Sequence, residues 1–209
     1  MIKAIVFDMD GVLIEAKDWH YQALNKALRL FGYEISRFDH LTTFDGLPTR
    51  KKLELLSLER DLPPELHSFI NEMKQGYTTE IVIASCKPRF IHEYALSRLK
   101  TMGYRLGVAS NSIRATVELM MQKAHLDGYL DVALSNQDVV NPKPHPEMYE
   151  MAASRLGVTP GECLVLEDND HGIRAAVASG ANVLVVREVT DVTLGNILAK
   201  IRDIDGILP

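Results

Sequence analysis

Short apolar runs alternate with helix-periodic segments along most of the chain. Most of these runs are almost continuously apolar, as expected of strands in a parallel sheet that is covered on both faces. The five predicted strands are Ala4–Phe7, Arg105–Ala109, Asp131–Leu134, Cys163–Leu166 and Val183–Val186. Helical spacing separates the later strands; one example is the set Met148, Tyr149, Ala152 and Leu156. The pattern predicts an α/β fold with a doubly wound, Rossmann-like parallel sheet.

The segment from about residue 15 to residue 86 breaks this alternation because it shows only helical patterns. One helix is predicted near 17–31, a second after Pro48, and a third after the sequence Asp61-Leu62-Pro63-Pro64. We therefore predict a helical subdomain, 15–86, inserted into a sheet domain made of 1–14 and 87–209. An insertion after the first strand lies at the sheet edge where open α/β folds bind ligands, so we expect it to act as a lid.

Composition and charge narrow the class of protein. The 209 residues are 46% hydrophobic and 24% charged, which excludes low-complexity and wholly disordered chains. Acidic residues outnumber basic ones by 28 to 23, with no basic block, which argues against a nucleic-acid partner. No apolar run is long enough for a membrane span, no secretory signal is recognisable, and the two cysteines lie far apart. We expect a reduced, cytoplasmic monomer with no membrane partner.

Polar side chains that could take part in catalysis or metal binding follow the predicted strands. Asp8 and Asp10 come after the first strand, Ser110 and Asn111 after the second, and the acidic pair Glu167-Asp168 at the end of the fourth; Lys143 stands in a proline-flanked loop. In a parallel sheet these strand ends meet at one edge. Four carboxylates there would repel one another unless a cation or a proton offset their charge, and all-oxygen ligation suits Mg²⁺. One carboxyl could then keep a proton and serve as a general acid.

Each of these motifs also has a purely structural interpretation. Asp8 and Asp10 could form a turn or a helix cap, and Asn169 with the acidic pair before it could cap a helix that begins near Asp170. Ser110 to Ser112 could cap a helix that begins at Ile113. Taken alone, these motifs leave both interpretations open. Their occurrence together, at successive strand ends, favours a functional site.

In this order, the motifs closely resemble those of the haloacid dehalogenase-like hydrolase superfamily. The first motif is Asp8-Met9-Asp10-Gly11-Val12, and the third is Lys143-Pro144-His145-Pro146. The second is a serine that ends a strand, here in Ala109-Ser110-Asn111-Ser112. The fourth is Glu167-Asp168-Asn169-Asp170-His171-Gly172-Ile173, in which Asn169 replaces the usual serine. The resemblance covers essentially the whole chain, because the helical insertion resembles the C1-type cap of that superfamily.

The resemblance implies a role for each catalytic residue. Asp8 would attack phosphorus and become an aspartyl-phosphate, and Asp10 would protonate the leaving oxygen and later accept a proton from water. Ser110 would hydrogen-bond a phosphoryl oxygen, and Lys143 would offset negative charge. The second aspartate of the first motif favours phosphomonoesterases and phosphomutases over dehalogenases.

The resemblance also implies ligands for metal and substrate. Mg²⁺ would be held by the Asp8 side chain, the Asp10 backbone carbonyl and Asp168, with Glu167 bound directly or through water. Substrate contacts would come from Ser110, Asn111 and Lys143 and, in the cap, from His20 and Arg50. For the two cap residues, a packed or solvated position on a helix is the alternative.

Three functions follow as hypotheses. The first is a Mg²⁺-dependent phosphatase for a small phosphorylated metabolite, such as a sugar or polyol phosphate. The second is a phosphomutase similar to β-phosphoglucomutase, in which a sugar hydroxyl replaces water as the phosphoryl acceptor. The third and most distant is a non-catalytic phosphoacceptor protein, although such receiver domains are shorter and lack an insertion of about 70 residues.

Overall fold

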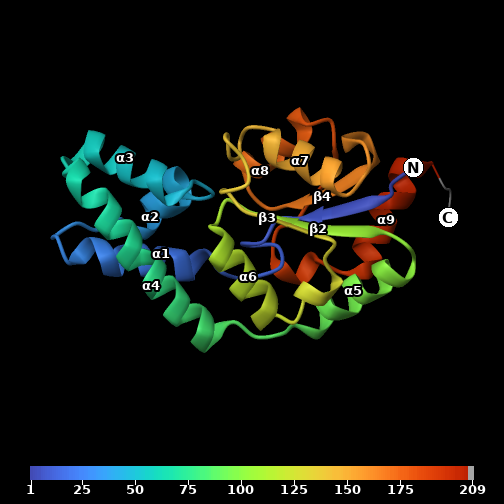
Figure 1. The fold of residues 1–209 in the computed structure, drawn as a ribbon, viewed down its shortest axis with the longest axis horizontal. Helices are drawn as coiled ribbons and strands as arrows, with labels where there is room; N and C mark the ends of the chain where they lie inside the picture. Colours follow the sequence, from blue (N-terminus) through green and yellow to red (C-terminus); the bar gives the residue numbers. More distant parts are fainter. Residues whose placement is uncertain (207–209) are drawn as a thin grey trace. The chain divides into compact units, whose positions relative to one another are not determined.

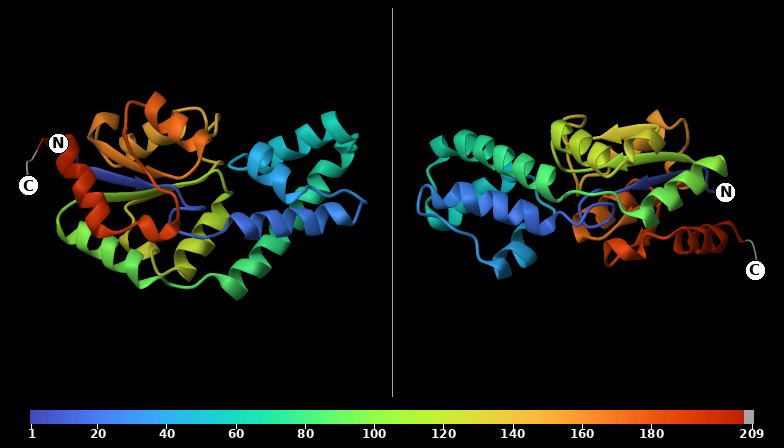
Figure 2. Two further views of the ribbon diagram at one scale, coloured as in Figure 1. Left: turned by 180° about the vertical axis from the view of Figure 1, so that it is seen from behind. Right: turned by 90° about the horizontal axis from the view of Figure 1, so that it is seen from below.

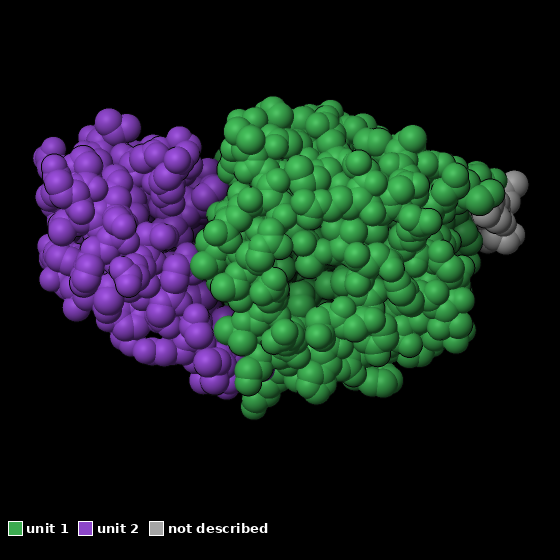
Figure 3. Space-filling view, viewed as in Figure 1, with its two compact units in different colours: residues 1–15, 87–209 green, residues 16–86 purple. Residues whose placement is uncertain are grey.

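A computed structural model of the chain describes residues 1–206. Its contacts divide the chain into two compact units (Figure 3). The sheet unit comprises Met1–Glu15 and the described residues from Lys87 onwards, and the helical unit comprises Ala16–Cys86. The chain thus leaves the sheet unit once and returns to it once.

The sheet unit contains five parallel strands in the order β3-β2-β1-β4-β5. Their bounds are β1 Ala4–Phe7, β2 Arg105–Ala109, β3 Val132–Leu134, β4 Cys163–Glu167 and β5 Asn182–Val185. All four residues of β1 and all five of β4 are buried, which explains their continuous apolar character. The predicted doubly wound parallel sheet is confirmed. Most strand ends coincide with the predicted ones, and the others differ by a single residue.

Helices cover both faces of this sheet (Figures 1 and 2). One face carries α7 (Glu147–Arg155) and α8 (Asp170–Ala178). The other carries α5 (Phe90–Thr101), α6 (Arg114–Lys123) and α9 (Leu194–Asp205). Short 3₁₀ turns complete the unit: η3 Asp127–Tyr129, η4 Pro160–Glu162 and η5 Val189–Asp191.

The register of the sheet brings distant parts of the sequence to one edge. Phe7 at the end of β1 pairs with Val108 on one side and with Leu166 on the other. The next residue, Asp8, continues this alignment because its backbone N–H donates to the Leu166 carbonyl at 2.9 Å. The strand order reverses between β1 and β4, which is where open α/β sheets bind their ligands. The first and fourth motifs therefore begin at the two strands that flank this reversal.

The helical unit contains no strand among its described residues, as predicted. Its α-helices are α1 Lys17–Arg29, α2 Arg37–Asp39, α3 Thr49–Arg60 and α4 His67–Ser85, joined by the π-helix η1 His40–Phe44 and the 3₁₀ turn η2 Pro64–Leu66. The long helices α1 and α4 pack against each other and cross at an angle in Figure 1. The apolar core of the unit is formed by Leu24, Leu28, Phe44, Leu53, Leu56 and Ile70, among others.

No helix within residues 1–206 is both long enough and apolar enough to cross a membrane.

Candidate active site

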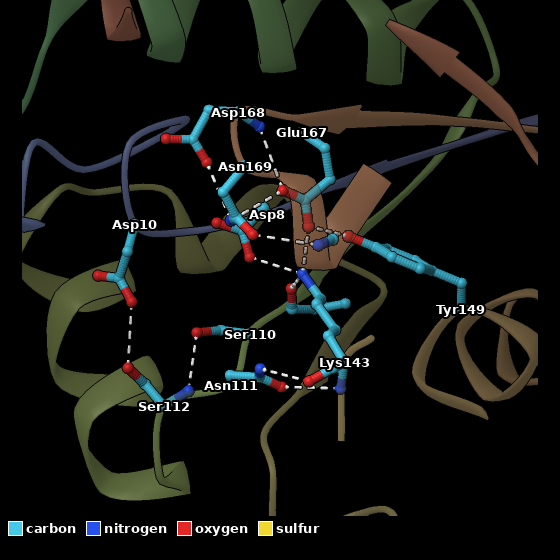
Figure 4. Close-up of polar contacts among 12 residues, drawn as sticks. Asp8, Asp10, Ser110, Asn111, Ser112, Lys143, Tyr149, Glu167, Asp168 and Asn169 are labelled. Carbon is cyan, nitrogen blue, oxygen red and sulfur yellow. Dashed lines mark hydrogen bonds and ion pairs between the residues drawn. The ribbon is translucent and has the colours of Figure 1, made fainter. Parts of the chain in front are cut away.

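A buried lysine lies between two buried carboxylates at the carboxyl edge of the sheet (Figure 4). The Lys143 ammonium is 2.6 Å from Asp8 Oδ1 and 2.6 Å from Glu167 Oε1, and it also donates to the Ala109 carbonyl at 2.8 Å. Asp8, Lys143 and Glu167 are 5%, 3% and 0% exposed. Two such short charge-assisted bonds fix the ammonium between the ends of β1 and β4.

Burial is the largest single influence on the pKa values of Asp8 and Lys143. It raises the pKa of the Asp8 carboxyl well above the ordinary value of 3.8, while the nearby Lys143 charge opposes that rise. Burial also disfavours the charged form of Lys143, but Asp8 and Glu167 outweigh it and raise the pKa of the lysine. The lysine therefore remains charged and neutralises one carboxylate of the cluster.

Glu167 accepts hydrogen bonds on both of its carboxylate oxygens. Besides Lys143, its Oε1 accepts from the Tyr149 hydroxyl at 2.5 Å, and its Oε2 accepts from the Asp168 N–H at 3.1 Å. A Cβ atom on Gly172 would lie only 1.7 Å from Glu167 Oε1, so glycine is the one residue that leaves room for this carboxylate. These contacts fix the fourth-motif glutamate as a buried hydrogen-bond acceptor.

Three carboxylates at this edge could hold a metal ion. Asp8, Glu167 and Asp168 each offer an oxygen, and these oxygens all lie within 4.8 Å of one another. Carboxylate oxygens are the ligands that Mg²⁺ prefers, so the donor set fits the predicted cofactor. Asp8 and Asp168 suit direct ligation better than Glu167, because the latter already accepts hydrogen bonds on both oxygens.

Asp10 is held two residues beyond Asp8 by a short loop. Gly11, at φ 95°, turns the chain so that its N–H donates to the Ile14 carbonyl at 2.7 Å. The half-buried Asp10 side chain accepts a hydrogen bond on Oδ2 from the Ser112 hydroxyl at 3.1 Å. The first and second motifs are thus linked directly (Figure 4).

Ser110 and Asn111 support the site from the end of β2. Ser110 is buried, and its Oγ accepts from the Ser112 N–H at 3.0 Å. The Asn111 amide binds the backbone of Lys143 twice, accepting from its N–H at 3.1 Å and donating to its carbonyl at 3.2 Å. Asn111 therefore positions the lysine loop, whatever contact it makes with a substrate.

The two cap residues predicted to bind substrate have different surroundings within the helical unit. His20 lies half-buried on α1, with its Nδ1 3.3 Å from the Lys74 ammonium. Arg50 lies in the first turn of α3, where its side chain is 80% exposed and 3.5 Å from Glu54. The exposed position of Arg50 matches that of a solvated helix start, and its contact with substrate stays a prediction.

Sequence reasoning did not assign a site role to Tyr149, or one beyond helix capping to Ser112. The helical spacing of Tyr149 indicated a core residue; it is buried, but its hydroxyl reaches Glu167 and its ring lies 4.7 Å from the Lys143 ammonium. Capping of the next helix was one of two interpretations that the sequence left open for Ser110 to Ser112. The N-cap of α6 is instead Ile113, which has no side-chain capping bond. Asn169 does cap α8, accepting from Gly172 N–H, so its motif serves both capping and the site.

Comparison with known families matches residues 5–186 to the family described as haloacid dehalogenase-like hydrolase. The chain belongs to this family. The four motifs that carry the resemblance to this hydrolase family are the ones that meet at the sheet edge.

Related proteins cover most of the chain. It is 27% identical over 182 residues to a phosphorylated carbohydrates phosphatase from Thermotoga maritima, an alignment that covers 86% of this chain and 82% of the relative. It is 29% identical over 189 residues to the pyrophosphatase PpaX from Bacillus velezensis, covering 86% and 80% respectively. The relatives are thus similar to this chain across both units.

Solved structures share the fold. CbbY from Rhodobacter sphaeroides, solved in complex with phosphate, is 25% identical and superposes with a TM-score of 0.81, covering 88% of this chain and 86% of that one. The β-phosphoglucomutase of Clostridium difficile gives a TM-score of 0.84 at 23% identity, covering 97% and 98%. Their similarity extends to the helical insertion as well as the sheet.

Proposed function

We propose that the chain is a Mg²⁺-dependent phosphatase that hydrolyses a small phosphate monoester, such as a sugar or polyol phosphate, through an aspartyl-phosphate. The observation that carries the proposal is the buried ammonium of Lys143, 2.6 Å from Asp8, at the same sheet edge as a second aspartate at position 10. The similarity to a phosphorylated carbohydrates phosphatase supports the choice of substrate class.

In the first half of the reaction, an Asp8 oxygen forms a bond to phosphorus while the bond from phosphorus to the ester oxygen breaks. Asp10 gives its proton to the departing oxygen, which leaves as an alcohol. Lys143 and the Ser110 hydroxyl offset charge on the phosphoryl oxygens. Lys143 donates to Asp8 Oδ1, so we assign the attack to the other carboxylate oxygen.

In the second half, a water molecule attacks the phosphorus of the aspartyl-phosphate, and the bond between phosphorus and the Asp8 oxygen breaks. Asp10 takes the proton of the water, so each residue returns to its starting state and inorganic phosphate leaves. Asp8, Asp168 and the Asp10 carbonyl would hold Mg²⁺, with Glu167 reached through water. The ion would supply further positive charge beside the phosphoryl group.

The second candidate is a phosphomutase, in which a sugar hydroxyl takes the place of water. The half-buried His20 beside Lys74 favours keeping this candidate, because β-phosphoglucomutases also carry a histidine on the first cap helix. The core residues and their roles are the same in both candidates. Only the acceptor of the phosphoryl group differs.

The test is a panel of hexose phosphates, polyol phosphates and pyrophosphate, assayed with Mg²⁺ and with EDTA. Phosphate release that needs Mg²⁺ and is confined to a few esters would establish the phosphatase. Interconversion of a hexose phosphate only after addition of a hexose bisphosphate would identify the mutase. A long-lived phosphoryl group on Asp8 without turnover would instead indicate a phosphoacceptor protein.

Asp8→Asn is the matched control for this panel. The amide has the shape of the carboxylate but is not a nucleophile, so we expect turnover to fall by about 10³-fold or more. Mass spectrometry of the acid-quenched wild-type enzyme should show one added phosphoryl group that the variant lacks. Activity of Asp8→Asn within a factor of ten of the wild type would refute the covalent mechanism.

A further inference from the structure

The hydroxyl of Ser112 makes a hydrogen bond that links the second motif to Asp10. Ser112 Oγ lies 3.1 Å from Asp10 Oδ2, although the two residues are 102 positions apart in the sequence (Figure 4). A serine directly before a helix commonly caps that helix. Here the N-cap of α6 is Ile113, with no side-chain capping bond, so the Ser112 hydroxyl serves Asp10 instead.

The backbone on both sides of this hydroxyl is fixed. The Ser112 N–H donates to Ser110 Oγ at 3.0 Å, and the Ser112 carbonyl accepts from the Asn136 N–H at 3.0 Å. The Asn136 side chain also donates to the Asn111 carbonyl at 2.9 Å. The loops after β2 and β3 therefore hold Ser112 in one place, and its hydroxyl can fix the Asp10 carboxyl without moving itself.

The hydrogen bond from Ser112 fixes how the Asp10 carboxyl is oriented. While the Ser112 hydroxyl donates to Oδ2, a proton on the carboxyl is favoured on the other oxygen, Oδ1. A general acid needs its proton on an oxygen aimed at the leaving group, because proton transfer depends on a short and aligned contact. In Ser112→Ala, the Asp10 carboxyl loses the hydrogen bond that makes Oδ2 an acceptor.

We propose that Ser112 is a positioning residue that orients Asp10 for proton transfer to the leaving oxygen. This inference rests on the proposed function, since it requires Asp10 to act as the acid. It differs from a general supporting role in one respect: its effect must depend on how much the leaving group needs a proton. An alkoxide is a strong base and needs one, whereas p-nitrophenolate is a weak base and leaves without it.

The experiment compares Ser112→Ala with the wild type on two esters, the fastest alkyl monoester of the panel and p-nitrophenyl phosphate. We expect kcat for the alkyl ester to fall about 10-fold or more, with KM nearly unchanged, as part of the typical 10²–10⁴-fold contribution of a general acid. The effect on p-nitrophenyl phosphate should stay below about 3-fold. Ser112→Thr keeps the hydroxyl and should restore most of the alkyl ester activity.

A double-mutant cycle tests whether Ser112 acts through Asp10. In an Asp10→Ala background, Ser112→Ala should cause no further loss with the alkyl ester, because the group that it orients is already absent. Ser135→Ala is the matched control, since Ser135 is a buried serine in the next loop whose hydroxyl binds Asp138. Any effect of that control should be the same on both esters.

The outcomes separate this inference from the proposed function. If Asp10→Ala leaves the alkyl ester activity unchanged, Asp10 is not the general acid, and both the proposed mechanism and the inference about Ser112 are refuted. If Asp10→Ala is inactive toward the alkyl ester but Ser112→Ala behaves as the wild type, only the inference falls. Equal losses on both esters, or additive losses in the double mutant, would show that Ser112 merely supports the loop.

Discussion

Buried ionisable groups are arranged differently in the sheet unit and in the helical unit. In the sheet unit, Lys143 is paired with Asp8 and Glu167, both at 2.6 Å, so opposite charges lie together away from water. In the helical unit, His40 is 2% exposed and its ring lies 4.9 Å from that of Tyr21. Burial, followed by the nearby Lys52 charge, lowers the pKa of His40 from 6.5 to about 4.

The same degree of burial thus leads to opposite protonation behaviour. Paired burial keeps Lys143 charged, and a fixed positive charge is what a phosphoryl-transfer site needs. Burial of His40 beside a like charge keeps the imidazole neutral. The sheet unit should therefore be sensitive to the loss of a charge, and the helical unit to the gain of one.

The largest effect is expected from removing the charge of Lys143. In Lys143→Met the side chain keeps its length, but Asp8 and Glu167 lose their shared partner. We expect kcat to fall by about 10²–10³-fold or more, as is typical when a group that stabilises developing charge is removed. The free energy of unfolding should fall by about 3–5 kcal/mol, because two carboxylates stay buried without the ammonium. Urea unfolding and phosphate release measure the two effects.

Lys100→Met provides the matched control within the sheet unit. Lys100 forms an ion pair with Asp131 at the surface, where both side chains are more than a third exposed. The unfolding free energy should change by less than about 1 kcal/mol, and the rate should not change. If both lysine variants lost the same stability, burial would not be what distinguishes the Lys143 pair.

The next effect concerns the pH dependence of the helical unit. Folding lowers the pKa of His40. Between about pH 6.5 and 4, His40 is therefore protonated in the unfolded chain but neutral in the folded unit. Stability from this group is complete above that window and is lost as the pH falls through it. From pH 7 to pH 5, His40 should remove about 2 kcal/mol of unfolding free energy.

His40→Phe isolates the contribution of His40 to the pH dependence of the unfolding free energy, because phenylalanine retains the ring beside Tyr21 but cannot bind a proton. The single tryptophan of the chain, Trp19, lies on α1 and reports on this unit by fluorescence during urea unfolding. The difference between the wild type and His40→Phe should change with pH by the amount given above. Parallel stability curves for the two proteins would contradict the assignment.

The smallest effect is expected for an exposed charge of the helical unit. The Arg50 side chain is 80% exposed beside Glu54, so Arg50→Ala should alter the KM of the best ester by less than about 2-fold and leave stability within about 0.5 kcal/mol.

His20→Ala is the comparison for Arg50→Ala, because it removes a half-buried group in contact with Lys74. It should raise KM about 10-fold, which corresponds to about 1.4 kcal/mol of binding. A larger effect of Arg50→Ala than of His20→Ala would identify Arg50 as the stronger of the two predicted cap contacts.

The sheet edge could be predicted from sequence because strand patterns and parallel register leave few alternatives. Ala4–Phe7 and Cys163–Leu166 were predicted as buried parallel strands, so Asp8 and Glu167 were expected at the same edge of the sheet; that the two strands are neighbours comes from the structure. The helical insertion was also predictable, since about 70 residues carry only helical periodicity. These parts depend on backbone pattern alone.

The parts that could not be predicted depend on side-chain direction. Tyr149 has the spacing of a core residue, and the sequence does not indicate that its hydroxyl reaches Glu167. Ser112 stands where a helix cap is expected, yet the helix begins one residue later and frees the hydroxyl for Asp10. Arg50 has a suitable charge, but periodicity cannot tell whether the start of a helix faces solvent. Such contacts require the assembled structure.

The two points where the chain passes between the units are tied together by one ion pair. Glu15, the last sheet-unit residue before the insertion, accepts a hydrogen bond at 2.6 Å from Arg89, which lies just after the return at Lys87. The two ends of the insertion are therefore joined by residues of the sheet unit alone, and no residue of the helical unit takes part in this ion pair. A shorter or longer helical insertion would therefore leave this ion pair of the sheet unit unchanged.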